Sequence, residues 1–406
     1  MTKNEKKVTL ISQGCRMNHA ETATMINEFK KNGFDEVSLS EEPDVVVINT
    51  CTVTENGDKD TIKLINKINR ESANSKIALV GCQAQIKKDK LLNLKNVNWV
   101  IGNEKKSETV TKIKENNTGL HIEKFQKQVF FQNFTSFDPR HTRVNLKIQD
   151  GCDFFCSFCI IPFARGPARS RDFENILKDA KSLISLGVKE IILTGINLGT
   201  YECNKKKFSD ILEELLNLNK NVHIRISSIE PTTIDFDIIK LWEKYSNFCR
   251  YLHLPLQSGC DDVLEKMRRK YTMSEYTSFI SEIKKEIPNI CIGTDVIVGF
   301  PGESNCNFQE TYNYLASSII NYFHVFSYSE RSLAHARKFD QKIPKLTIKN
   351  RSEQLRNLSA KKWANYLNEF INKKVYVLFE QEKNNHWIGS TDNYIKVKCK
   401  YPNYIK

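Results

Sequence analysis

The sequence predicts an α/β protein with a doubly wound parallel-sheet domain, a larger region of strand–helix units and a small β module. Short apolar runs alternate with helical patterns from residue 8 to residue 102, and the alternation resumes at residue 143. A long helical segment, residues 347–372, precedes two strand-like runs, VYVLFEQ and YIKVKCK. We therefore expect three domains, at residues 1–135, 138–370 and 371–406.

The first region has the pattern of a doubly wound parallel sheet. Helical stretches separate four apolar runs, VTLIS, VVVINTC, IALVGC and NWVIG, as βαβ units require. The first three runs end at or near a cysteine, namely Cys15, Cys51 and Cys82. Because ligands gather at the carboxyl ends of parallel strands, we expect these three thiols to meet and to form a metal site.

The second region contains six strand-like runs, each paired with a helical pattern: RVNLKIQD, IILTGIN, HIRISSI, YLHLPLQS, ICIGTDVIVGF and YFHVFSYS. A parallel sheet of that many units curls toward a partial or full barrel, whose functional groups lie at the carboxyl ends of its strands. Residues 103–140 are polar and lysine-rich and include the strand-like VFFQNF, so we expect a linker there.

Composition favours a soluble protein of the cytoplasm. The chain has 406 residues, 40% of them hydrophobic, and no stretch approaches the roughly eighteen apolar residues that a membrane span requires. Its twelve cysteines do not indicate disulfides, because that compartment is reducing. Clustered thiols then favour metal binding or catalysis. We expect the isolated cysteines to pack as small hydrophobic residues: Cys203, Cys249, Cys260, Cys291, Cys306 and Cys399.

The charge is compatible with an RNA partner. The net charge is +13 and the pI is about 9.0, which suits a polyanion. Lysine is abundant along the whole chain, however, so charge alone does not decide between RNA binding and a generally basic composition. Taken singly, we expect the basic runs KKDK, NKKK and MRRKYT to be solvated surfaces.

Three thiols lie close together in GCDFFCSFCIIPFARG: Cys152, Cys156 and Cys159. A structural zinc site needs four protein ligands, and no further cysteine or histidine follows at zinc-finger spacing. A 4Fe–4S cluster on three thiolates leaves one iron without a protein ligand, where a small molecule can coordinate. This spacing favours such a cluster.

These residues carry a family resemblance. The cysteines and Phe158 resemble the C-x3-C-x-aromatic-C signature of radical S-adenosylmethionine (SAM) enzymes. The segments GCRMN, NTCTVTE, VGCQAQ, LHLPLQSG, MRRKYT and GTDVIVGFPGE resemble the methylthiotransferases of that superfamily, in the same order. The tail resembles their RNA-binding TRAM module, although the sequence ends at Lys406. The resemblance implies a radical SAM partial (β/α)6 barrel between a cluster domain and a short TRAM-like module.

The resemblance also implies two 4Fe–4S clusters and a mechanism. The cluster on Cys152, Cys156 and Cys159 would bind SAM and supply the electron that cleaves it, giving a deoxyadenosyl radical. The second cluster, on Cys15, Cys51 and Cys82, would hold or donate sulfur, and a second SAM would methylate it. The electron would come from a reductant protein such as flavodoxin or ferredoxin.

Further site residues are expected at strand ends. Phe158 would lie against the adenine of SAM and Gly195 near its methionine amino group, while Ser227, Glu230 and Gln257 would reach its ribose or carboxylate. A simple turn glycine and ordinary loop hydrogen bonding are the alternatives for these positions. Arg165, Arg169 and Arg171 follow the cysteine loop, where a guanidinium can bind a substrate carboxylate or phosphate.

Our leading hypothesis is a tRNA methylthiotransferase that acts on carbon 2 of threonylcarbamoyl-adenosine next to the anticodon. Two observations favour this branch of the family. The segments GCRMNHAET and IIPFARGPARSRD resemble it, and the three arginines could pair with the threonylcarbamoyl carboxylate. The alternatives are the same chemistry on isopentenyl-adenosine tRNA or on a ribosomal protein. An alternative of another class is a non-catalytic, metal-binding RNA-interaction protein.

Overall fold

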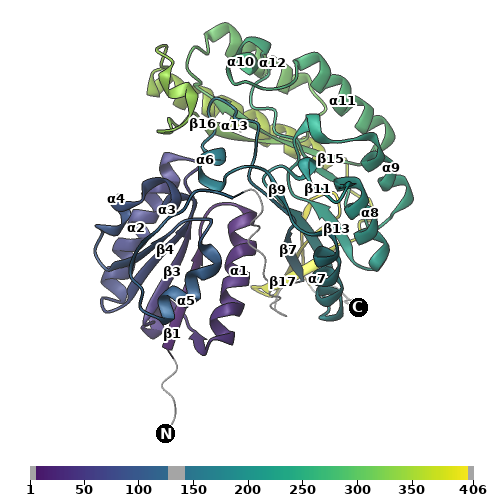
Figure 1. The fold of residues 1–406 in the computed structure, drawn as a ribbon. Coiled ribbons are helices and arrows are strands. Elements are labelled where there is room, and N and C mark those ends of the chain that lie inside the picture. The colour runs from purple at the N-terminus through teal and green to yellow at the C-terminus, as the bar shows by residue number, and fades with distance from the viewer. Residues whose placement is uncertain (1–5, 127–141, 401–406) are drawn as a thin grey trace.

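The computed structural model describes residues 6–126 and 142–400, and its first part is a parallel sheet of six strands (Figure 1). The spatial order is β2-β1-β3-β4-β5-β6. The strands are β1 (Lys6–Ser12), β2 (Phe34–Glu36), β3 (Val45–Thr50), β4 (Lys76–Gly81), β5 (Val97–Ile101) and β6 (Gly119–His121). The sequence predicts the four central strands and misses the two at the edges, which are three residues long.

Helices cover both faces of this sheet, which confirms the doubly wound fold. They are α1 (Arg16–Lys31), α2 (Glu55–Glu71), α3 (Cys82–Lys87), α4 (Asp89–Leu92) and α5 (Thr109–Lys114). Helices α1 and α5 pack on the face that bears Val47, while α2, α3 and α4 pack on the face that bears Val46. Strand β3 is buried on both faces, as expected of a central parallel strand.

The expectation of a linker over residues 103–140 is wrong for its first half. Residues 106–121 form a short 3-10 helix, α5 and β6, and β6 completes the sheet. Both α5 and β6 are short and partly exposed, so their polar residues hide the alternation of buried positions. The run VFFQNF lies outside the described residues.

The second part is the predicted partial barrel, and all six of its expected strands are present. They are β7 (Arg143–Lys147), β10 (Glu190–Thr194), β13 (His223–Ile226), β14 (Tyr251–His253), β15 (Cys291–Val298) and β16 (Tyr322–Ser327). The strands form two parallel sheets, β7-β10-β13 and β14-β15-β16, and a bridge between Ile224 and Phe248 joins their inner edges. Strands β7 and β16 are the two free edges of the described barrel.

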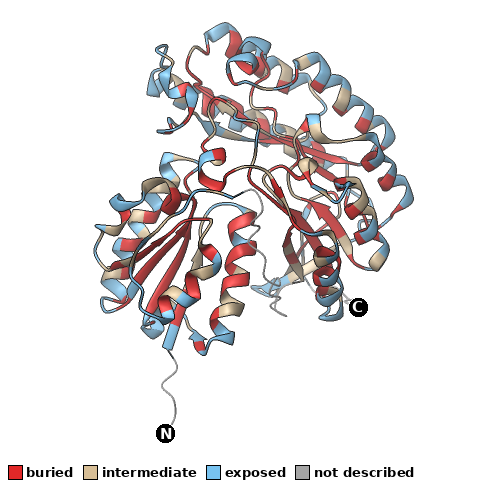
Figure 2. Ribbon diagram, viewed as in Figure 1, coloured by how far each residue is buried: buried red, intermediate tan, exposed pale blue. Residues whose placement is uncertain are grey.

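Helices lie on the outside of the barrel strands (Figure 1). They are α7 (Phe173–Ser185), α8 (Phe208–Leu218), α9 (Phe236–Lys244), α10 (Asp261–Lys266), α11 (Met273–Glu286), α12 (Asn305–Ser317) and α13 (Lys345–Asn368). The inner faces of these helices are buried and their outer faces exposed, as Figure 2 shows. Side-chain caps fix several helix starts; Asp172, for example, accepts a hydrogen bond from the backbone N–H of Asn175 at 2.9 Å.

Shorter elements connect the barrel strands. The helix α6 (Ile161–Arg165) follows the cysteine loop, and two small antiparallel pairs are β8 (Gln149–Asp150) with β9 (Arg169–Ser170) and β11 (Glu202–Cys203) with β12 (Lys206–Lys207). Five 3-10 helices complete the described chain: Leu39–Glu41, Lys106–Glu108, Leu198–Thr200, Pro231–Thr233 and His335–Lys338.

The C-terminal module is an antiparallel sheet of three strands, β17 (Leu378–Lys383), β18 (His386–Ser390) and β19 (Lys396–Cys399). It docks on the amino ends of the barrel strands, opposite the cysteine loop. Buried Arg225 on β13 pairs with Glu190 at 2.8 Å and donates to the backbone carbonyls of Thr391 and Asp392 at 3.1 and 3.0 Å. The module is therefore attached through desolvated hydrogen bonds.

Two other expectations concern single features of the fold. Cys249, Cys260 and Cys291 are buried as predicted, whereas Cys306 is exposed. Within the described residues, every helix is too short or too polar to cross a bilayer.

Candidate functional site

The loop that carries Cys152, Cys156 and Cys159 follows the carboxyl end of β7 and is fixed at several points. The backbone N–H of Cys152 donates to Gly166 at 3.1 Å, and Ser157 bonds through its backbone N–H to Met267 and through its hydroxyl to Lys266. Gly151 has a φ of +73°, and a Cβ there would lie 1.9 Å from a backbone oxygen. The loop therefore holds its three thiols in a defined place.

A buried ion pair lies beside these thiols. Arg269 donates to the Cys156 sulfur at 3.4 Å and to both carboxylate oxygens of Glu230, at 2.6 and 2.8 Å. Burial raises the pKa of Cys152 to about 11 and that of Cys159 to about 12, and the neighbouring thiols add to both shifts. Three such thiols become thiolates only beside compensating positive charge, which a cation such as Arg269 or bound iron can supply.

The second set of thiols meets at one edge of the first sheet. Cys15 follows β1, Cys51 follows β3 and Cys82 begins α3 directly after β4. These three strands are neighbours in register, so their carboxyl ends coincide. Gly14 has a φ of +84°, and a Cβ there would lie 2.7 Å from the Cys51 sulfur. Burial and the thiols of Cys82 and Cys15 raise the pKa of Cys51 to about 12.

A cavity of about 180 Å³ lies between the two thiol sets. Cys159 and Phe158 line it on one side, and Val53 and Thr54, which follow Cys51, line it on the other. Two contacts hold these sides together. The backbone N–H of Glu55 donates to Ser329 at 2.9 Å, and Arg331 donates to Thr52 at 3.0 Å. The cavity therefore adjoins Cys159 directly and the segment that follows Cys51 in the chain.

The residues predicted to contact SAM fall into two groups. Phe158 and Gln257 share the cavity with Cys159, and Phe158 packs in one cluster with Ile297 and Tyr328. The other three lie outside the described lining of this cavity. Gly195 is a tight turn, where a Cβ would meet Leu198 at 2.8 Å; the backbone of Ser227 bonds to the neighbouring strand; and Glu230 is held by Arg269.

The three arginines predicted to bind substrate are buried inside the protein. Arg165 is 0% exposed and pairs with Glu21 at 2.9 Å and Asp150 at 3.0 Å. Arg169 pairs with Glu104 at 3.0 Å, and Arg171 pairs with Asp179 at 3.1 Å. Each guanidinium already has a carboxylate partner within the chain. These ion pairs favour a role in packing the domains and loops, and substrate binding by the three arginines stays a prediction.

Arg165 belongs to a charge network between the first domain and the barrel. Glu21 on α1 accepts from Lys106 at 2.6 Å and Lys147 at 2.8 Å as well as from Arg165, and Lys147 also reaches Asp150 at 2.7 Å. Burial alone would raise the pKa of Glu21, but the three cations hold it well below its usual value. The network joins the domains close to both thiol sets.

The sequence interpretation missed four residues of this site: Arg269, His253, Asp295 and His324. Arg269 lies in MRRKYT, expected to be solvated, yet its side chain is only 4% exposed. The alternation of β14, β15 and β16 brings the other residues together: a His253 ring nitrogen lies 3.0 Å from the Asp295 carboxylate, and the exposed His324 ring lies 5.7 Å from the His253 ring. That alternation was the available signal.

Comparison with known proteins agrees with the fold. The model of the radical SAM superfamily matches residues 146–315, and that of the uncharacterized protein family UPF0004 matches residues 7–102. A solved radical SAM methyltransferase, TsrM from Kitasatospora setae, aligns with a TM-score of 0.60 at 14% identity, covering 79% of this chain and 73% of that one. The cobalamin-dependent radical enzyme OxsB aligns with a TM-score of 0.56 at 12% identity, covering 87% of this chain and 56% of that one.

Curated relatives match almost the whole chain. The threonylcarbamoyladenosine tRNA methylthiotransferase MtaB of Bacillus subtilis is 36% identical over 95% of this chain and 89% of its own, and that of Aquifex aeolicus is 37% identical over 97% and 96%. The tRNA-2-methylthio-N(6)-dimethylallyladenosine synthase of Christiangramia forsetii is 31% identical over 96% of this chain and 87% of its own.

The fold and its cysteine loop define a radical SAM enzyme. More specifically, the chain belongs to the radical SAM methylthiotransferase family, whose members transfer sulfur-containing groups and use SAM and two 4Fe–4S clusters. The residues fit these groups, because each thiol set offers three soft sulfur donors and Gly14 leaves room beside Cys51.

Proposed function

We propose that this enzyme methylthiolates carbon 2 of threonylcarbamoyl-adenosine next to the anticodon of tRNA. The cavity carries the proposal, since it is lined by Cys159 of one thiol set and by Val53 and Thr54, which follow Cys51 of the other. Several curated relatives with this substrate in their names support it, two of them at 36% and 37% identity. The basic net charge of +13 suits a polyanionic substrate.

Cys152, Cys156 and Cys159 would hold one cluster, and Cys15, Cys51 and Cys82 the other. When bound, the first supplies the electron that cleaves SAM and the second supplies sulfur. Phe158 and Gln257 would orient SAM in the cavity, with the Phe158 ring against its adenine. Arg269 and Glu230 would position the Cys156 side of the loop and exclude water from it.

We also propose that an acidic reductant protein such as flavodoxin or ferredoxin docks beside the first thiol set. A surface pocket is lined by Cys156 and Cys159 and by three cations, Arg268, Arg337 and Lys338. The exposed side chains Phe155 and Phe163 flank the same pocket. An acidic protein would complement these charges, and the thiol ligands would bring a cluster near the surface. Arg337→Gln with Lys338→Gln should slow SAM cleavage driven by flavodoxin but not by dithionite.

The main alternative is the same chemistry on isopentenyl-adenosine tRNA. It is favoured by the relatives named as dimethylallyladenosine synthases, at 30% to 31% identity. A ribosomal-protein substrate has no comparable support among these relatives. A cytoplasmic location follows from the proposed substrate and remains a prediction.

The test is nucleoside mass spectrometry of tRNA from cells with and without this protein. Loss of the methylthio form of threonylcarbamoyl-adenosine is expected, while loss of the isopentenyl product instead would identify the alternative. Iron, sulfide and zinc analysis after anaerobic reconstitution excludes the non-catalytic zinc protein if it finds about eight irons per chain.

A further inference from the structure

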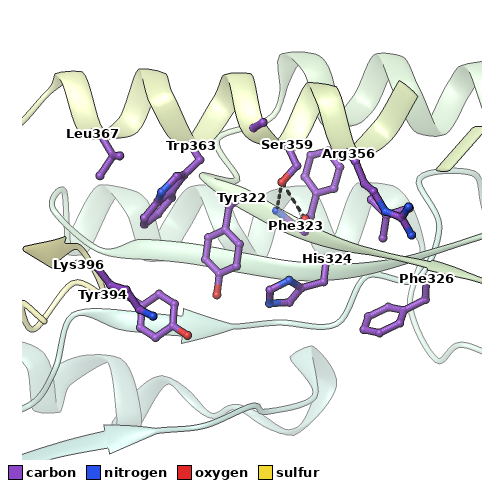
Figure 3. A pocket seen from close by; sticks show the side chains of 12 residues that line it. Tyr322, Phe323, His324, Phe326, Arg356, Ser359, Trp363, Leu367, Tyr394 and Lys396 are labelled. Carbon is purple, nitrogen blue, oxygen red and sulfur yellow. Dashed lines mark hydrogen bonds between the residues drawn. The ribbon is translucent and has the colours of Figure 1, made fainter. Parts of the chain in front are cut away.

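A second and larger pocket lies along the free edge strand of the barrel. It has a volume of about 670 Å³ and is bordered by β16, α13 and the C-terminal module. Figure 3 shows Tyr322, His324 and Phe326 pointing from β16 toward the same side. The side chains of Arg356 and Trp363 extend from α13 toward β16. This volume is in the range of pockets that enclose a small molecule or a nucleoside.

The floor of this pocket is aromatic. The rings of Tyr322 and Trp363 meet edge to face at 5.4 Å, and those of Tyr322 and Tyr394 lie nearly parallel, 13° apart, at 6.0 Å. Tyr394 and Trp363 belong to different domains, so the floor exists only when the module is docked. Aromatic faces of this kind stack on nucleobases and other flat groups.

The rim of the pocket is cationic. Arg356 and Lys396 line it, both are exposed, and neither makes an ion pair or side-chain hydrogen bond with the described residues. None of the described residues that line the pocket carries a carboxylate. Isolated surface cations are usually only solvated. Here, however, the two cations are unpaired, unlike the arginines near the cysteine loop. Unpaired cations beside an aromatic floor suit a ligand that carries an anion on a flat group.

The pocket adjoins the small cavity at one residue. Phe326 lines both. The His324 ring, which lines the large pocket, lies 5.7 Å from the His253 ring, and His253 contacts Asp295 in the smaller cavity. The two spaces therefore lie on either side of Phe326.

We propose that this pocket binds the substrate RNA, with a flat group on the aromatic floor and an oxyanion held by Arg356 at one end of the pocket or by Lys396 at the other. The inference rests on the proposed function for the identity of the RNA. Two sources of the oxyanion share this chemistry: the carboxylate of the threonylcarbamoyl group and a backbone phosphate beside the modified base. The carboxylate is the favoured source, because that group extends from the base that must enter the adjoining cavity.

The test measures binding of anticodon stem-loop RNA to the reconstituted holoenzyme without turnover. Three RNAs carry adenosine, threonylcarbamoyl-adenosine or isopentenyl-adenosine at the target position. Either Arg356→Gln or Lys396→Gln should weaken binding of the threonylcarbamoyl RNA about tenfold, since it removes one charge-assisted hydrogen bond. Lys361→Gln is the matched control, because Lys361 is an exposed cation of α13 that does not line the pocket.

The three RNAs distinguish the outcomes. A loss confined to the threonylcarbamoyl RNA identifies the carboxylate, and an equal loss for all three identifies a phosphate. Losses no larger than that of Lys361→Gln overturn the proposal. Because binding is measured without product formation, an enzyme that methylthiolates only isopentenyl-adenosine would refute the proposed substrate and still leave this site testable.

Discussion

Arg269 shows how one side chain can support a reactive loop. Its guanidinium donates hydrogen bonds to Glu230, to the Cys156 sulfur and to the backbone carbonyl of Pro255, the last at 3.0 Å. Burial raises the pKa of Glu230, although Arg269 opposes that shift. The pair is therefore desolvated, and neither partner tolerates the loss of the other.

Replacing Arg269 with glutamine should lower the free energy of unfolding by about 3 kcal/mol, because Glu230 is left buried without its cation. The same variant should hold less iron at the first thiol set. Thermal denaturation and iron analysis measure both effects. The adjacent, exposed Arg268 provides the control, since Arg268→Gln should change stability by less than about 0.5 kcal/mol.

The two thiol sets should be separable by substitution. Alanine at Cys152, Cys156 and Cys159 should abolish SAM cleavage, whereas alanine at Cys15, Cys51 and Cys82 should leave cleavage and end sulfur transfer. Each triple variant should lose about four irons per chain. Full yields of methylthio product from the second variant would contradict the assignment of that set to sulfur.

Single residues differ in how far the sequence predicts them. The thiols were predictable because the spacing of Cys152, Cys156 and Cys159 is local and the strand ends fix the other set. The role of Arg165 was not, because its partner Glu21 lies 144 residues away on another domain. A charge beside a cysteine loop looks the same in sequence whether it faces substrate or a buried carboxylate.

At the scale of elements, α1 is the helix that connects the domains. It contacts β7 of the barrel, and its buried Glu21 receives three cations. Burial would raise the pKa of Asp150 as well, but Lys147 and Arg165 lower it. Both carboxylates are thus ionised in the folded protein at a pH where they would be protonated in an unfolded chain.

This predicts acid sensitivity of the domain contact. A carboxyl whose pKa is lower when folded stabilises the protein above its unfolded pKa, near 4, and that contribution is lost progressively as the pH falls below about 5. Glu21→Gln should destabilise the protein by about 3 kcal/mol at pH 7 and flatten its pH dependence between pH 5 and pH 3. Unfolding by urea at each pH measures this. Glu28→Gln, on the same helix, is the control for stability, since its surface pair with Lys31 should contribute less than about 1 kcal/mol.

Elements with strong alternation or periodicity were predicted, and short ones were not. The run AQIKKDKLLN looks like one helix, but the chain breaks into α3 and α4 at Lys88, which has a φ of +46°. Strands β2 and β6 and the middle strand β18 were missed because they are short and partly polar. Tertiary pairing, rather than local pattern, defines them.

On the scale of the whole molecule, the thiols and the C-terminal module lie at opposite ends of the barrel strands, and the large pocket on β16 extends between them. Binding of tRNA should therefore involve many basic residues and weaken steeply with salt. If about five phosphates of the loop are neutralised, the logarithm of the affinity should fall with a slope of about −3.5 against the logarithm of salt concentration. A slope near zero would show that basic residues do not dominate the binding of tRNA.

Removing residues 375–406 should reduce this affinity and its salt slope while leaving the iron content unchanged. It should also lower the melting temperature, because Arg225 and Glu190 lose the backbone groups that cover them. If the truncated chain binds tRNA as tightly as the full chain, the C-terminal module does not contribute to RNA binding.

The order of the thiols along the chain has a consequence for biosynthesis. Cys15, Cys51 and Cys82 lie within a sheet that is complete by His121, before any cysteine of the other set has been synthesised. Since domains generally fold from the amino terminus during translation, we expect this site to receive its iron first. Docking of α6 then buries Arg165 against Glu21 and closes the seam between the domains. Pulse-labelling with radioactive iron on stalled nascent chains would reveal the sequence of loading, and iron bound first at Cys152 would contradict it.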